Sequence, residues 1–139
     1  MYTYQYPRAA VTTDALVFVK ENNRQFILLI ERMNEPFKNK WALPGGFIEM
    51  DETLENACKR ELEEETGLKV DKMTQFKTYD AVDRDPRHRT ISTIFFAELD
   101  KKQKVKGGDD AARAEWFPVS GLPELAFDHE QIIKEFFKL

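Results

Sequence analysis

Three carboxylates near the end of one helical segment have the residue type and spacing for metal chemistry. A helix of 3.6 residues per turn that starts near Thr53 places four apolar side chains on one broad face. These are Leu54, Ala57, Cys58 and Leu62. Glu61 and Glu65 fall between them, and Glu64 lies at their edge. An unpaired carboxylate turned toward the interior costs several kcal/mol, and bound divalent cations supply the missing charge. The pattern therefore predicts a metal site.

A solvated acidic helix end is the alternative, because runs of Asp and Glu usually lie on a protein surface. The spacing of the surrounding residues argues against it. Gly46 is followed after five residues by Glu52 and, after seven more, by the run RELEEETGL at 60–68. These seven identities and two apolar positions resemble the Nudix box, the signature of the Nudix hydrolases. The preceding residues 41–46, WALPGG, are similar to the family's strand-to-loop entry.

This resemblance implies a role for each matching residue. The implied metal ligands are Gly45 through its carbonyl, Glu52, Glu61, Glu64 and Glu65. Arg60 would orient the glutamates through charge-assisted hydrogen bonds. Glu52 would be a supporting ligand, although a capping or helix-dipole role fits its place near the helix start almost as well. Mg²⁺, or Mn²⁺ in its place, would neutralise two adjacent phosphates and activate a water for in-line attack.

Further candidates lie outside the motif. Asp109 and Asp110 precede a short strand, where the family often places another acid that binds metal or activates water. We favour Asp110 as a catalytic residue, and a plain loop acid is the alternative. Cys58, on the apolar helix face, is expected to be a core residue, and His129 to be structural.

Four residues are candidate substrate contacts. Arg32 could reach phosphates, and surface pairing with a neighbouring glutamate fits equally well. Trp41 and Phe47 flank the glycine turn and could stack on a base or pack in the core. Arg84 belongs to the segment 83–89, which is either a substrate-contacting loop or a solvated turn around Asp-Pro.

The order of elements predicts one α/β domain spanning residues 1–139. Strands are expected at 11–19, 25–30, around 41, 74–82, 90–98 and 115–117, and the first two form a hairpin. The box helix is expected over 53–66, ending at Gly67. A second helix starts near Asp128, with Gln131 completing a capping box, and runs to the C-terminus. This arrangement matches the Nudix-type α/β/α sandwich with a mixed sheet that the resemblance implies.

Composition sets the wider context. Apolar residues make up 42% of the 139 residues, including eleven Phe, which is enough for a packed core. The single cysteine cannot form an internal disulfide, and no segment resembles a signal peptide or a membrane span. We therefore expect a cytoplasmic protein that does not bind membranes.

Charge is unevenly distributed along the chain. Residues 46–68 hold eight acids and two bases, a balance of −6, whereas the whole chain carries −4. The remainder is therefore +2 and does not repel an anionic substrate. No basic stripe of the kind that nucleic-acid-binding proteins carry is present in the sequence.

The resemblance implies a hydrolase that cleaves the pyrophosphate bond of a nucleoside diphosphate linked to another moiety. Segments 116–129 and 83–87 are similar to the branch that splits ADP-ribose into AMP and ribose 5-phosphate. One alternative is a house-cleaning nucleoside triphosphate pyrophosphatase. The other is a non-catalytic Nudix-like ligand sensor, which would carry a winged-helix domain for which a chain ending at Leu139 has no room. The sequence leaves open whether two chains pair as a homodimer.

Overall fold

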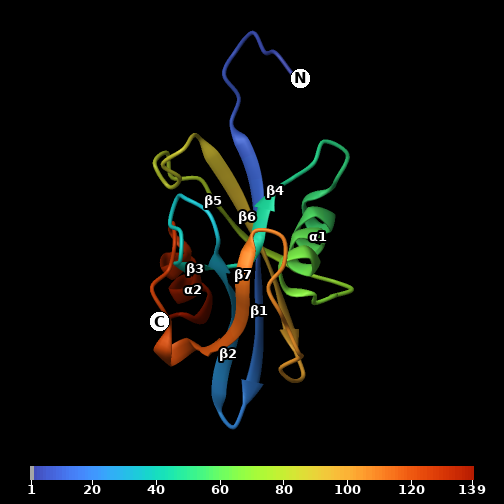
Figure 1. Ribbon diagram of the computed structural model, residues 1–139, viewed down its shortest axis with the longest axis vertical. Helices are drawn as coiled ribbons and strands as arrows, with labels where there is room; N and C mark the ends of the chain where they lie inside the picture. Colours follow the sequence, from blue (N-terminus) through green and yellow to red (C-terminus); the bar gives the residue numbers. More distant parts are fainter. Residues whose placement is uncertain (1) are drawn as a thin grey trace.

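The computed structural model describes residues 2–139 and consists of a mixed sheet with a helix on each side (Figure 1). The fold class predicted from the sequence is therefore confirmed. The strands are β1 (Ala10–Glu21), β2 (Arg24–Arg32), β3 (Trp41–Ala42), β4 (Gly45–Phe47), β5 (Thr74–Tyr79), β6 (Thr90–Leu99) and β7 (Ala111–Pro118). The helices are α1 (Leu54–Thr66), a short 3₁₀ turn η1 (Val119–Gly121) and α2 (His129–Phe137).

The predicted hairpin of the first two strands is present. Its two-residue turn, Asn22 and Asn23, has φ values of 52° and 65°, which asparagine tolerates and which match the twist of paired strands. β1 also runs parallel to β6 from Ala10 to Val19, and every other strand pairing is antiparallel. The sheet is mixed for this reason.

The central strands are buried on both faces, which explains their nearly continuous apolar sequence. Ala15 and Val17 of β1 face a core that includes Leu62 of α1. Leu16 and Phe18 alternate with them along the strand, so they point to the opposite side of the sheet. There they face a second core that includes Ile132 and Ile133 of α2. Each helix therefore closes one of two separate apolar cores.

The first two strands separate partway along their length. β1 pairs with β2 only over Phe18–Glu21, and nearer its N-terminus it pairs with β4 through Thr12, Thr13 and Asp14. β2 continues instead alongside β3 and β7. The sheet is consequently open between β1 and β2, with the β3–β4 segment crossing the gap.

The box helix has the ends that the sequence predicts. Thr53 caps its N-terminus by accepting a hydrogen bond from the Asn56 amide at 3.2 Å. Gly67 ends it in the left-handed region, with φ of 78°. No helix among residues 2–139 is long and apolar enough to cross a membrane.

Three local predictions are wrong. A turn was expected at Pro44–Gly46, but Gly45 and Gly46 belong to β4, because their backbone pairs with β1. β7 is eight residues long, not three, since it lies beside β2 over most of that length. The capping box at α2 does not form: Asp128 makes no side-chain cap bond, and the Gln131 side chain donates to Glu135 at 3.1 Å.

Leu62→Ala should lower the free energy of unfolding by about 2–5 kcal/mol, because it leaves a cavity between α1 and the sheet. Leu62 is fully buried, whereas Leu139 is 70% exposed and supplies the matched control. Urea denaturation of both variants measures the difference. An equal loss in Leu139→Ala would contradict this assignment of the core.

Candidate functional site

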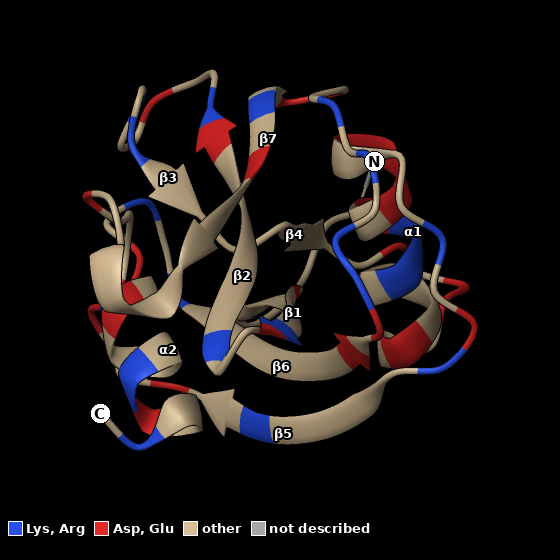
Figure 2. Ribbon diagram, turned by 90° about the horizontal axis from the view of Figure 1, so that it is seen from below, with Lys and Arg blue, Asp and Glu red and all other residues tan. Residues whose placement is uncertain are grey.

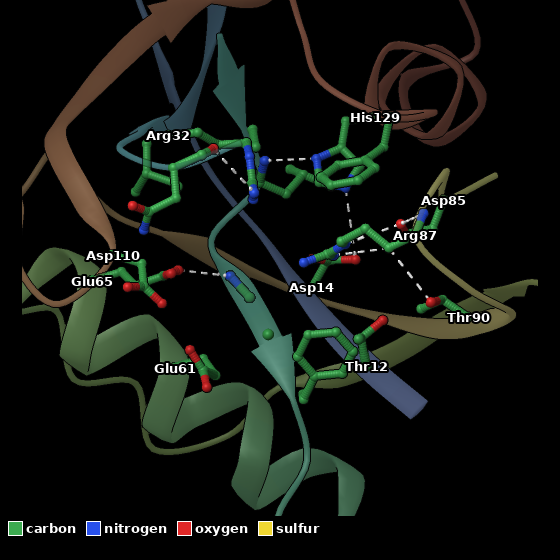
Figure 3. A pocket seen from close by; sticks show the side chains of 18 of the residues that line it. Thr12, Asp14, Arg32, Glu61, Glu65, Asp85, Arg87, Thr90, Asp110 and His129 are labelled. Carbon is green, nitrogen blue, oxygen red and sulfur yellow. Dashed lines mark hydrogen bonds and ion pairs between the residues drawn. The ribbon is translucent and has the colours of Figure 1, made fainter. Parts of the chain in front are cut away.

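A pocket of about 280 Å³ lies where β1 and β2 separate (Figure 3). β1 contributes Thr12 and Asp14, β2 contributes Arg32, and the glycine segment crosses between them. The remaining lining comes from α1 and the start of α2, from the loops after β2 and β5, from the start of β6 and from the loop before β7. Those residues include Glu61, Glu65, Arg84, Asp85, Arg87, Asp110, Phe127 and His129.

Acidic side chains of α1 form one wall. The backbone N–H of Gly45 donates to Glu65 Oε1 at 2.8 Å, which fixes this carboxylate beside the glycine segment. Glu65 is only 4% exposed, and burial raises its pKa well above the ordinary value. Burial also raises the pKa of Glu61, although the adjacent Arg60 opposes the shift. Both groups need positive charge nearby to stay ionised.

Gly46 is a glycine because Glu61 occupies the space of a side chain. A Cβ at this position would lie 2.8–2.9 Å from the Glu61 carboxylate. At Gly45 a Cβ would meet the Thr13 carbonyl at 2.2 Å. The two glycines therefore let the β3–β4 segment pass between β1 and the carboxylates of α1.

Arg60 connects the acids of the box. Its guanidinium donates to Glu52 at 2.5 and 2.8 Å, to Glu61 at 2.9 Å and to Glu64 at 3.3 Å. The hydrogen bond from Arg60 lowers the pKa of Glu52, and Arg60 has its own pKa raised by these partners. In Figure 2 a basic (blue) segment of α1 lies between acidic (red) segments of the same helix. Glu52 lies against Arg60, and its roles as metal ligand and as cap stay predictions.

Three carboxylates have the spacing to share a cation. Oxygen atoms of Glu61, Glu64 and Asp109 lie within 4.8 Å of one another. An all-oxygen donor set of this kind suits Mg²⁺ or Mn²⁺. The sequence favoured Asp110 over Asp109, and the structure divides them, with Asp109 beside Glu61 and Glu64 and Asp110 lining the pocket.

Cationic side chains form the opposite wall. The Arg32 guanidinium lies 5.0 Å from the Phe127 ring centroid and donates to the Pro36 carbonyl at 2.8 Å. Arg87 lies 5.8 Å from the same ring and 5.4 Å from that of Phe47. Burial, followed by the nearby Arg87 charge, lowers the pKa of Arg32. Two cations beside the same Phe127 ring, close enough for Arg87 to lower the pKa of Arg32, favour an anionic ligand.

The four candidate substrate contacts lie in different environments. Arg32 and Phe47 line the pocket, and Phe47 is 41% exposed. Trp41 does not line it: the side chain is buried, with its ring 4.8 Å from that of Phe117. Arg84 lines the pocket but donates to both oxygens of Asp128, at 2.9 and 2.7 Å.

Several lining residues were not singled out from the sequence. Asp14 is buried, accepts a hydrogen bond from Ser92 Oγ at 2.6 Å and lies 3.8 Å from His129 Nε2. An acid inside an apolar strand was the available signal. Arg87 and Phe127 lie in the segments 83–89 and 116–129, which the sequence did indicate, but no local pattern distinguished these two residues from their neighbours. His129, which the sequence indicated as structural, is buried and accepts a hydrogen bond from the Leu43 N–H at 3.0 Å.

Comparison with known proteins assigns the class. The family model described as "NUDIX domain" matches residues 10–138, which is nearly the whole chain. The chain therefore belongs to the Nudix family, in agreement with the resemblance of the box, and is a Nudix hydrolase by sequence and fold.

Individual relatives and solved structures within the family are similar to this chain over most of its length. An "ADP-ribose pyrophosphatase" from Methanocaldococcus jannaschii is 45% identical over 133 residues, covering 96% of this chain and 76% of the relative. The "ADPR responsive transcriptional repressor NtrR" from Acinetobacter baylyi is 32% identical, and the match covers 95% of this chain but only 54% of the repressor. Among solved structures, the NUDIX domain of Shewanella oneidensis NrtR complexed with ADP ribose superposes with a TM-score of 0.89 at 30% identity. That match covers 96% of this chain and 89% of the domain.

Glu65→Gln should stabilise the metal-free protein at neutral to alkaline pH. Because burial raises the folded-state pKa of Glu65 above 4.5, the folded protein retains a proton that the unfolded chain has already lost. The free energy of unfolding therefore falls as the pH rises from about 4.5 through the folded-state pKa. The variant, which has no such proton, avoids this loss, about 1.4 kcal/mol for each unit of the raised pKa.

Urea denaturation in EDTA at about pH 4 and about pH 8 measures the effect. The two proteins should have similar stability at the lower pH, and the variant should be more stable at the higher pH. Glu63→Gln, on the exposed face of α1, is the matched control. A variant less stable than the wild type at the higher pH would contradict the buried-charge argument.

Proposed function

We propose that this protein hydrolyses ADP-ribose to AMP and ribose 5-phosphate with the help of Mg²⁺ or Mn²⁺. The observation that carries the proposal is the opposition of two walls in one pocket. Carboxylates of α1 lie on one side, and Arg32 and Arg87 on the other. A diphosphate between them can be bound by metal ions on one side and by guanidinium groups on the other.

The box carboxylates would hold the metal. Glu61 and Glu64, with Asp109, have the spacing for one cation, and Glu65 is a buried carboxylate beside them whose charge a cation would offset. The carbonyl of Gly45 is a further candidate ligand. When bound, the cation neutralises phosphate charge and lowers the pKa of a bound water. A solved structure supports this reading: the bifunctional NMN adenylyltransferase/ADP ribose pyrophosphatase from Francisella tularensis is complexed with AMP and a Mn ion. It is 33% identical to this chain with a TM-score of 0.86, and the match covers 97% of this chain and 43% of that protein.

The protein's own groups would orient the reaction. Arg60 holds Glu52, Glu61 and Glu64 in fixed positions, so little rearrangement is needed when a cation binds. Asp110, which lines the pocket, is the candidate to accept a proton from the attacking water. Arg32 and Arg87 would bind phosphate oxygens and keep the diphosphate in line with that water.

The substrate assignment rests on the relatives and on the aromatic rings of the pocket. A protein with 45% identity is named as an ADP-ribose pyrophosphatase, and a structure with a TM-score of 0.89 contains ADP ribose. Phe47 and Phe127 offer apolar faces beside the arginines for a base or a sugar.

A ligand sensor is the second candidate, because one of the matched proteins is named as an ADPR-responsive transcriptional repressor. The fully retained box argues for catalysis: Arg60 and all four glutamates of the box are in place, and three carboxylates can share a cation. A protein that only senses the ligand needs binding without hydrolysis, so a turnover assay separates the two functions.

We further propose that residues 1–139 act as one domain in the cytoplasm and bind a nucleotide but no nucleic acid. The free, buried thiol of Cys58 supports a reducing compartment. The balance of charge outside the box gives no basic stripe for nucleic acid. Association into a homodimer is open to measurement by light scattering.

Hydrolysis should require Mg²⁺ or Mn²⁺ and stop in excess EDTA. Glu64→Gln and Glu65→Gln should each lower the rate at least about a hundredfold, because each removes a charged metal ligand. Release of AMP, followed by chromatography, measures the rate, with Glu63→Gln as the control on the same helix. Undiminished turnover in EDTA would refute the metal assignment.

ADP-ribose should have a higher kcat/KM than dGTP or its oxidised form, and the products should be AMP and ribose 5-phosphate. Arg87→Ala should mainly raise KM, because it removes a contact common to ground and transition states. Arg24→Ala, at the distant β1–β2 hairpin, is the matched control. A preference for a triphosphate, with pyrophosphate released, would overturn the ADP-ribose assignment and leave the Nudix chemistry intact.

A further inference from the structure

The first two residues at the start of α2 direct their side chains away from their own helix. Asp128 occupies the N-cap position but makes no cap hydrogen bond, and its carboxylate accepts two bonds from Arg84. His129, the first helical residue, is 3% exposed and lines the pocket (Figure 3). A side-chain cap normally stabilises the start of a helix, so its loss here indicates another use for the Asp128 side chain.

His129 fixes the segment that carries the two glycines. Its Nδ1 accepts the Leu43 N–H at 3.0 Å, which places the ring proton on Nε2, facing Asp14. The next residue, Pro44, accepts a hydrogen bond from the Ala15 N–H at 2.7 Å. Gly45 then donates to Glu65 at 2.8 Å. Three consecutive residues are thus anchored, and the first anchor is a side chain of α2.

Asp128 fixes the other wall. Arg84, with a side chain only 5% exposed, begins the stretch that continues to Asp85 and Arg87. Burial alone would lower the pKa of Arg84, and the Asp128 carboxylate raises it instead. Asp85 in turn binds the Arg87 guanidinium at 2.8 and 3.1 Å. Two ion pairs, Asp128–Arg84 and Asp85–Arg87, therefore meet at adjacent loop residues and link α2 to the cation that lines the pocket.

We propose that Asp128 and His129 are positioning residues that act on opposite walls of the pocket. His129 sets the glycine segment against the carboxylates of α1 and thereby affects the chemical step. Asp128 sets the loop that carries Arg87 and thereby affects substrate binding. This inference rests on the proposed hydrolysis of ADP-ribose. It predicts that substitutions of His129 change kcat, whereas substitutions of Asp128 change KM.

Two substitutions of His129 separate the effect of its hydrogen bond to Leu43 from the effect of its size. In His129→Asn the side-chain oxygen can take the place of Nδ1 and accept the Leu43 N–H, whereas His129→Leu fills similar space without an acceptor. The leucine variant should lose about 10- to 100-fold in kcat with little change in KM, as expected for a residue behind a metal site, and asparagine should restore most of it. Asp128→Asn should mainly raise KM, in the same direction as Arg84→Ala.

Steady-state kinetics of these variants test the proposal, with Glu130→Gln, exposed on α2, as the control and thermal melting to monitor folding. Equal losses in the leucine and asparagine variants, or a fall in kcat alone for Asp128→Asn, would overturn it. If the leucine variant fails to fold, hydrogen exchange of the Leu43 amide in the wild type decides: slow exchange supports the bond to His129, and rapid exchange refutes it.

A second measurement separates this inference from the proposed function. Mn²⁺ binding, followed by electron paramagnetic resonance, needs no substrate. The leucine variant should bind Mn²⁺ about tenfold more weakly than the asparagine variant, because Glu65 loses its fixed partner at Gly45. If the wild type leaves ADP-ribose intact but this difference appears, the function is wrong and the positioning role of His129 is supported. Equal Mn²⁺ affinities would refute that role.

Discussion

Repulsion among carboxylates that α1 brings together is the constraint around which the site is built. Glu61, Glu64 and Glu65 lie within two turns, and Glu65 is buried. Arg60 offsets part of this charge, and the Gly45 N–H offsets another part. The proposed cation would offset what is left, which is why the carboxylates and the metal are expected to act as one unit.

The opening between β1 and β2 allows this charge to face a ligand. A continuous sheet would separate α1 from the start of α2, and each helix would contact only the apolar core on its own side of the sheet. Because the strands part and a glycine segment crosses between them, acids from one helix and a histidine from the other line one pocket. The loop after β5, which carries Arg84 and Arg87, then completes the pocket from a third direction.

Sequence reasoning succeeded where local pattern and function coincide. The box helix and its ends follow from apolar phase, Thr53 and Gly67, and the inward glutamates follow from the same phase. It failed where distant contacts decide. Gly45–Phe47 has the composition of a turn and becomes a strand only beside β1. Asp128 has the sequence of a cap, but Arg84, 44 residues earlier, takes its carboxylate. No local pattern encodes such partners.

The order of strands also limits when this protein can fold during synthesis. β1 cannot complete its pairing until β6, about eighty residues later, has left the ribosome, and β2 must wait longer for β7. Until then two of the most apolar strands are exposed with unpaired edges, which are prone to associate with other chains. The β1–β2 hairpin can form early, since its turn is local, and it provides each strand with one partner during the delay.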